Sequence, residues 1–150
     1  MIDEIKKLRE ITGAGVMDAK KALEEAGGDI KKAELLIKEK GLAKAEKRAE
    51  REVACGRVAS YVHQNNKLAA LVEVATETDF VANTEEFGTL CKEIAMQVAS
   101  MNPGSVEELL EQDYIRDSSR KIKDLVTELI AKTGENAKVV RFHRMELGEE

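Results

Sequence analysis

The sequence predicts an α+β fold, in which three short helices precede a small antiparallel sheet with helices on one of its faces. Three observations support this prediction. The N-terminal part repeats apolar side chains at helical spacing between glycine-containing turns. Two runs rich in Val, Ala and Leu then flank an asparagine turn, and a β-branched run lies near the C-terminal end. The larger part is therefore expected to have the order β-β-α-α-β.

The N-terminal part is expected to be a compact helical module. Residues 1–41 contain three amphipathic stretches, with Asp29 as the predicted N-cap of the third and Gly41 as its end. Residues 42–52 are rich in Ala, Lys, Arg and Glu and have little apolar face, which predicts an exposed helical linker. Residues 53–150 are then expected to form the α+β core domain.

The core domain is predicted to begin with a β-hairpin. Its strands are residues 53–63 and 67–76, joined by Gln64-Asn65-Asn66, because asparagine tolerates the positive φ of a tight turn. Alternation along the second strand predicts one shared face. That face consists of Leu68, Ala70, Val72 and Val74.

A long amphipathic helix is predicted to follow the hairpin. Asn83 offers an N-cap and Glu86 lies three residues later, as in a capping box. Apolar residues, Cys91 among them, continue at helical spacing until Asn102-Pro103-Gly104 breaks the pattern. The remaining predicted elements are a short helix at 106–111, a longer helix at 118–132 and a strand at 137–147.

Composition excludes several classes of protein. No apolar run reaches the roughly 20 residues that cross a bilayer, and the N-terminal end lacks the apolar stretch of a signal peptide. We therefore expect a cytoplasmic protein that does not bind membranes. The net charge of −5 argues against nucleic acid as the main partner. Cys55 and Cys91 form no metal-binding motif, so free thiols and no metal are expected.

No catalytic constellation is visible. The chain has no phosphate-binding glycine loop, no zinc-binding HExxH and no GxSxG nucleophile motif. His63 and His143 each stand apart from any nucleophile. These observations favour a binding protein without cofactors over an enzyme.

Two segments are candidates for binding a partner. Thr78, Asp79, Phe80 and Val81 lie between the second strand and the long helix, so Phe80 is either packed beneath that helix or exposed to a partner. Spacing leaves both positions open and slightly favours the buried one. Val16 and Met17 follow a two-glycine turn and either pack in the module or form an exposed apolar knob, which suits the adaptable Met side chain.

Three motifs along the whole chain resemble the elongation factor Ts family, in the family's order and spacing. They are Leu8–Leu23 (LREITGAGVMDAKKAL), Glu77–Ala82 (ETDFVA) and Gly134-Glu135-Asn136 followed by the segment through Gly148. The resemblance implies that residues 1–41 form a ubiquitin-associated-like bundle. It also implies nucleotide exchange on the translational GTPase elongation factor Tu.

The resemblance further implies roles for both candidate segments. In the family, the segment that matches Thr78, Asp79, Phe80 and Val81 enters the nucleotide-binding domain of elongation factor Tu. The Phe wedges between helices, and its neighbours help dislodge the Mg²⁺ that holds GDP. The region that matches Val16 and Met17 grips another part of the same domain.

The chain has room for one core subdomain, and it resembles short family members that act as homodimers. Phe142, Arg144 and Tyr61 are the predicted interface residues. Two alternatives stand beside exchange. The chain is a module that binds ubiquitin-like or nascent-chain partners, or it is a small-molecule enzyme, which would require a polar pocket with convergent titratable groups.

Overall fold

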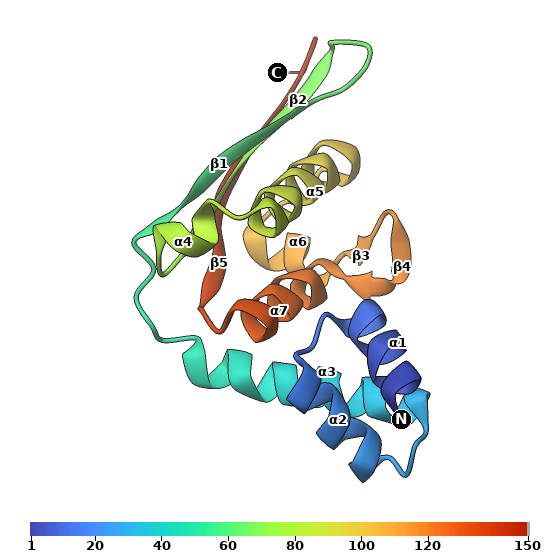
Figure 1. Ribbon diagram of the computed structural model, residues 1–150. Helices are drawn as coiled ribbons and strands as arrows, with labels where there is room; N and C mark the ends of the chain where they lie inside the picture. Colours follow the sequence, from blue (N-terminus) through green and yellow to red (C-terminus); the bar gives the residue numbers. More distant parts are fainter. Residues whose placement is uncertain (150) are drawn as a thin grey trace.

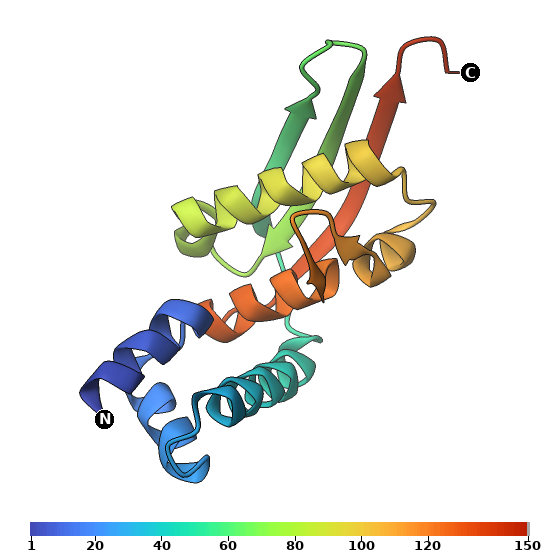
Figure 2. The ribbon, with the colours of Figure 1, turned by 90° about the vertical axis from the view of Figure 1, so that its right-hand side faces the viewer.

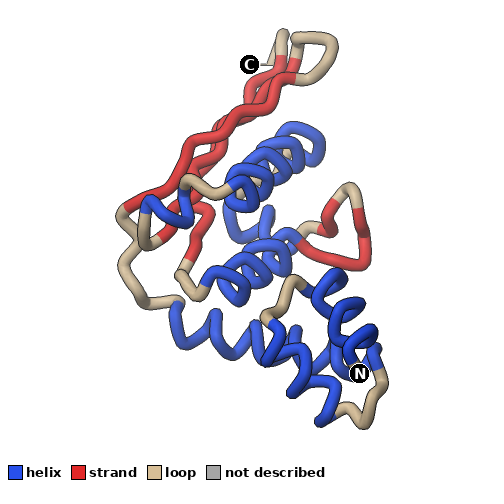
Figure 3. Tube along the Cα trace, in the orientation of Figure 1, coloured by secondary structure: helices blue, strands red, loops and turns tan. Residues whose placement is uncertain are grey.

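The computed structural model describes residues 1–149 and is mixed helix and strand (Figure 1, Figure 3). The N-terminal helices are α1 (Ile2–Thr12), α2 (Val16–Glu25) and α3 (Ile30–Arg48). They are followed by β1 (Cys55–Val62), β2 (Leu68–Thr76), α4 (Asp79–Ala82), α5 (Glu85–Met101), α6 (Val106–Glu111), β3 (Asp113–Tyr114), β4 (Asp117–Lys121), α7 (Ile122–Thr133) and β5 (Ala137–Glu146). None of the helices within this range is both long and apolar enough for a membrane crossing.

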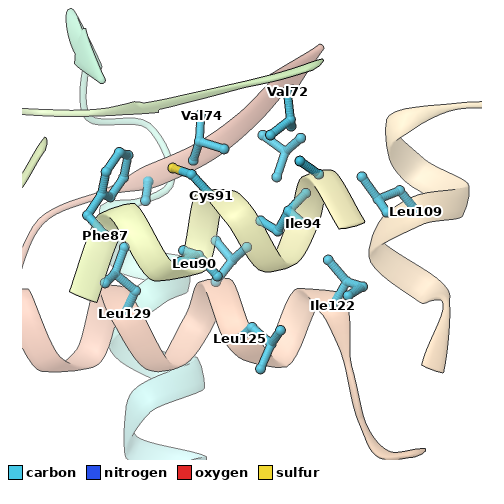
Figure 4. Packing of buried hydrophobic residues seen from close by; sticks show 14 of the residues in the cluster. Val72, Val74, Phe87, Leu90, Cys91, Ile94, Leu109, Ile122, Leu125 and Leu129 are labelled. Carbon is cyan, nitrogen blue, oxygen red and sulfur yellow. The ribbon is translucent and has the colours of Figure 1, made fainter. Parts of the chain in front are cut away.

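The core domain is built on an antiparallel sheet with the strand order β1-β2-β5. Figure 1 shows α5, α6 and α7 on one side of the sheet, and Figure 2 shows α5 lying across it. Val72 and Val74 face α5 from the sheet, while Leu125 and Leu129 reach it from α7 (Figure 4). The α+β class and the predicted hairpin are confirmed, and Asn66 has the expected positive φ of 58°.

No helix among residues 1–149 covers the opposite face of the sheet (Figure 1). Strand register places Val58 and Val62 of β1, Leu71 of β2 and Met145 of β5 on this open face, where all four are exposed. The three predicted interface residues lie elsewhere. Tyr61 and Phe142 pack against the helix-covered core, and Arg144 Nε donates to the Ala99 carbonyl of α5 at 2.9 Å. These residues therefore do not belong to the open face, since adjacent residues of a strand point to opposite sides, and their place in an interface stays a prediction.

The N-terminal helices form a separate small cluster, whose buried residues are Leu8, Ala19, Ala22, Leu23 and Ala33. The third helix does not stop at Gly41. It continues to Arg48, and Gly41 is buried where α3 crosses α7. A Cβ at Gly41 would lie 3.3 Å from Cβ of Ala131, so this glycine permits close helix packing instead of ending a helix. Ala45 also packs against the core.

Two further boundaries differ from the prediction. The N-cap of α5 is Thr84, whose Oγ1 accepts from the Phe87 N–H at 3.2 Å, whereas Asn83 ends α4. The helix predicted from residue 118 begins at Ile122, after the β3–β4 hairpin. Ser119 donates from its backbone and hydroxyl to Asp117 in this hairpin, and such local bonds favour a turn over a helix.

Candidate functional site

The segment that carries Phe80 is a short helix of its own. The hydroxyl of Thr78 accepts from the Val81 N–H at 3.4 Å and caps α4. Val81 and Ala82 are buried on the core side, so the helical turn directs Asp79 and Phe80 outward. Phe80 is 91% exposed. The buried position beneath α5 that spacing slightly favoured is therefore wrong.

Phe87 of α5 is fully buried in the core, with its ring directed toward the sheet (Figure 4). The core domain thus contains one phenylalanine packed as its centre and another projected into solvent. A ring with 91% of its surface in water adds almost nothing to the packing of the core, although it could bury a large apolar area against a partner. Phe80 is accordingly the first candidate for a contact with another molecule.

Thr78 is held by a residue that the sequence did not assign to the site. Its backbone N–H donates to Glu135 Oε1 at 2.9 Å, and its hydroxyl donates to Glu135 Oε2 at 2.7 Å. Glu135 lies 57 positions away along the chain. The motif Gly134-Glu135-Asn136 was visible as a sequence pattern, but its contact with Thr78 depends on the pairing of β2 with β5.

A cysteine and a carboxylate meet at the base of α4. Loss of solvent around the Cys55 thiol raises its pKa, and the adjacent carboxylate of Asp79 raises it further by hydrogen bonding and repulsion. Cys55 is a free thiol. Its raised pKa keeps it protonated near neutral pH, so it is a poor nucleophile.

The second predicted segment lies at the start of α2. Val16 and Met17 are 50% and 61% exposed, while Ala19, Ala22 and Leu23 of the same helix form the module core. Of the two predicted alternatives, burial in the module or an exposed apolar knob, the structure therefore shows the exposed one. Their contact with a partner stays a prediction.

The end of α7 lies between the two exposed segments. Lys132 lies against Gly13 in the loop before α2, where a Cβ on the glycine would be 3.0 Å from the lysine Cε. The Lys132 ammonium also pairs with Glu86 at 3.3 Å, in the first turn of α5. This helix end thus contacts the loop next to Val16 as well as the helix that follows α4.

A groove of about 850 Å³ runs between α3 and α7 and is open to solvent. Several of its charges face opposite charges, as in the Lys38–Asp124 contact at 4.0 Å and the Arg120–Glu128 pair. Within residues 1–149, no three His, Cys, Asp or Glu side chains are grouped so that they could hold a metal. The groove therefore offers mixed surface charges and no metal centre among the described residues.

Comparison with known proteins supports the sequence resemblance. The family model for elongation factor TS matches residues 77–150, which begin just before α4. Elongation factor Ts of Thermotoga petrophila is 44% identical over 191 residues, which cover 99% of this chain and 96% of that protein. The chain belongs to the elongation factor Ts family. Phe80 and Glu135 both fall within the part that the family model matches.

Other relatives match a similar share of this chain and of their own length. Elongation factor Ts of Leptospira biflexa and that of Coprothermobacter proteolyticus are each 44% identical, with 97% of this chain and 96% of each relative covered. The alignment with the Thermotoga petrophila protein runs over 191 residues, whereas this chain has 150. That relative therefore carries internal residues that have no counterpart here.

Proposed function

We propose that the chain is a guanine-nucleotide exchange factor for elongation factor Tu. It binds the GDP-bound GTPase in the cytoplasm and promotes release of GDP so that GTP can bind. Phe80 enters the GTPase as an apolar wedge, and the exposed Thr78 and Asp79 beside it help displace Mg²⁺, while Val81, which is buried, anchors the turn that presents them. The observation that carries the proposal is the 91% exposure of Phe80 on a capped and anchored helical turn.

The physical basis is differential binding to two states of the GTPase. Mg²⁺ offsets the charge of the diphosphate, so its loss weakens GDP binding. A factor that prefers the metal-poor state weakens the binding of GDP to the GTPase by some ratio. GDP must weaken the binding of the factor to the GTPase by the same ratio. Burial of one large apolar side chain contributes roughly 1.5–3 kcal/mol to that preference. No covalent chemistry is required of this chain.

Val16 and Met17 supply a second contact in this proposal. They lie in the N-terminal module, whereas Phe80 lies in the core domain, so both would reach the same GTPase at different points. Two linked contacts raise the effective concentration of each for its own site. The module would therefore set affinity, while Phe80 would set the rate of GDP release from the complex.

Release of labelled GDP from purified elongation factor Tu tests the proposal. We expect the wild-type chain to accelerate release with saturable concentration dependence. The double variant Val16→Ala/Met17→Ala should need a higher concentration for half-maximal effect but reach a similar maximal rate, as expected for lost uniform binding. Leu35→Ala is the control, because Leu35 is also exposed but lies on α3. Absence of acceleration by the wild type would contradict the proposal.

We also propose that two copies of the chain associate through the open face of the sheet. This face carries Val58, Val62, Leu71 and Met145 without a covering helix. On the same face, the side chains of Glu73 and Arg141 form an ion pair at 3.4 Å. Because a two-fold interface brings the same surface of both copies together, a face with both positive and negative charge can be complementary to itself. Association would remove the exposed apolar side chains from water.

Sedimentation equilibrium tests this assembly. The wild type is expected at twice the mass of one chain, and Leu71→Glu is expected at the mass of one chain, because a carboxylate would be buried unpaired in the interface. Leu35→Glu, on an exposed position of α3, should leave the mass unchanged. A monomeric wild type, or a dimeric Leu71→Glu variant, would contradict an interface at this face.

A further inference from the structure

The turn after α7 contacts the strand end that leads into α4. Gly134 ends α7 with a φ of 78°, a conformation that glycine adopts without strain. The next residue, Glu135, accepts from Thr76 Oγ1 at 3.2 Å in addition to its two bonds from Thr78. One carboxylate thus accepts three hydrogen bonds from two residues just before α4.

The bonds of Thr78 form a directed chain. Its hydroxyl hydrogen points to Glu135, which leaves an oxygen lone pair to accept from the Val81 N–H. The carboxylate therefore fixes the rotamer that caps α4. Loss of Glu135 would free the hydroxyl to rotate, and a helix of four residues has little other hydrogen bonding to hold its axis.

The neighbouring residue ties the same turn to the end of the module. The Asn136 N–H donates to Glu77 Oε1 at 2.8 Å, and its side-chain amide donates to the Arg51 carbonyl at 2.8 Å. Asn136 is buried, as expected of an amide whose donors are satisfied. The two residues after Gly134 therefore serve different neighbours: Glu135 holds the start of α4, and Asn136 also holds the chain that leaves α3.

We propose that Glu135 is a positioning residue for nucleotide exchange, which acts through Thr78 to hold Phe80 in the orientation that enters the partner. This inference rests on the proposed exchange function. Preorganisation explains why a carboxylate is used here. A side chain ordered before binding loses less entropy on insertion, so more of its burial appears as stabilisation of the bound state.

A simpler role for Glu135 is to hold β2 and β5 together. The ladder of these strands already pairs Thr76 with Ala137 through the backbone, and the one Thr76 hydroxyl proton, shared between Glu135 and the Asn136 carbonyl at 3.2 Å, could go to the carbonyl alone. The strands therefore have contacts at this point that do not need the carboxylate. Only the bonds to Thr78 reach beyond the ladder to α4, and these make the positioning role separable from the structural one.

Amide hydrogen exchange of the isolated chain tests the positioning contact without the GTPase. In Glu135→Ala, the amides of Thr78 and Val81 should exchange at least about tenfold faster, because both lose a fixed acceptor. Glu135→Gln keeps an oxygen for the Thr78 N–H and should restore much of the protection. Unchanged exchange at Thr78 and Val81 in Glu135→Ala would overturn the inference.

Gln97→Ala is the matched control for a general loss of stability. Gln97 is a buried amide that donates to the Asp113 carbonyl at 3.0 Å and accepts from the Ile115 N–H at 3.0 Å, away from α4. It should leave the local protection of Thr78 unchanged. Equal acceleration at Thr78 in Gln97→Ala and Glu135→Ala would show a global effect and would also overturn the inference.

GDP release from elongation factor Tu then measures coupling between Glu135 and Phe80. Glu135→Ala should lower the maximal rate several-fold in the wild-type background and have no further effect in Phe80→Ala. It should lower the rate by the same factor with or without Val16→Ala/Met17→Ala. Independent effects of Glu135→Ala and Phe80→Ala would overturn the inference. A wild type that does not accelerate release would instead overturn the exchange function, while the hydrogen-exchange result would still stand.

Discussion

Phe80 of α4 and Phe87 of α5 are seven residues apart and have opposite environments. Phe80 is 91% exposed, whereas Phe87 is fully buried in the core beneath the sheet. The interruption of the helix between α4 and α5 causes the difference. Thr84 restarts the helix with a new cap, so the side chains of α4 and α5 do not share one helical stripe. α5 therefore packs its phenylalanine in the core, and α4 presents its phenylalanine to solvent.

The two cysteines repeat this contrast. Cys91 of α5 is fully buried with its side chain against the sheet, whereas Cys55 lies at the base of α4 beside Asp79. Burial raises the pKa of the Cys91 thiol to about 11. The comparison of α4 with α5 therefore predicts that the same substitution lowers stability strongly in α5 and only slightly in α4.

The largest expected effect is on stability. Phe87→Ala should lower the free energy of unfolding by about 3–5 kcal/mol, because it leaves a cavity in the core. Phe80→Ala should change it by less than about 0.5 kcal/mol, because the ring has almost no contacts to lose. Urea unfolding followed by circular dichroism measures both. Phe87→Leu is the control and should lose less than Phe87→Ala; equal losses at positions 80 and 87 would break the comparison.

The next effect is a pH dependence of stability from Cys91. The folded pKa of about 11 lies above the ordinary value of 9.0, so the folded state holds the thiol proton more tightly than the unfolded state. This contribution is complete below pH 9 and is lost as pH rises toward 11. Its size is on the order of 3 kcal/mol, from about 1.4 kcal/mol for each of two pKa units.

Urea midpoints between pH 8 and 11 measure this loss when the wild type is compared with Cys91→Ala. Lysines and tyrosines titrate in both proteins, so the difference between them isolates the thiol. The wild type should lose more stability than the variant over this interval. Cys55→Ala should show a difference of the same sign but smaller, because the Cys55 pKa is also raised but its thiol is only partly buried. Parallel curves for the wild type and Cys91→Ala would contradict the contrast between the two cysteines.

The smallest effect concerns the break between the helices. Thr84→Ala should destabilise the chain by about 1 kcal/mol, because the Phe87 N–H loses its side-chain acceptor. Asn83→Ala should cost less, since Asn83 follows α4 and does not cap α5. Thermal unfolding of both variants checks the order. A larger loss for Asn83→Ala would show that Asn83 is the N-cap of α5, as the sequence predicted. It would contradict the separation of α4 from α5.

Much of the fold was predictable because it depends on local patterns. The asparagine turn of the β1–β2 hairpin, the apolar stripe of α5 and the β-branched start of β5 all carry signals within a few residues. The continuation of α3 past Gly41 was not predictable, because the glycine packs closely against Ala131, far along the chain. Local rules favour a helix end at glycine, and tertiary packing overrode that preference.

The candidate site was predictable in its residues but not in its geometry. Thr78 and Phe80 stood out by their place between a strand and a helix, yet Asn83 and Thr84 are adjacent and both are good caps. Neither cap reveals that residues 79–82 form a separate short helix, whose buried Val81 and Ala82 leave Phe80 on the exposed side. Glu135 was missed because its role depends on a strand pairing that joins residues 57 positions apart.

The rate of GDP release from elongation factor Tu at saturating factor tests most directly whether Phe80 is a wedge. Phe80→Ala should lower the acceleration at least about tenfold, in line with roughly 1.5–3 kcal/mol for burial of one large apolar side chain, and Phe80→Leu should fall between. Both variants should unfold at the urea concentration of the wild type, so that the loss is not one of folding. Release at the wild-type rate by a folded Phe80→Ala variant would contradict the role of the exposed ring.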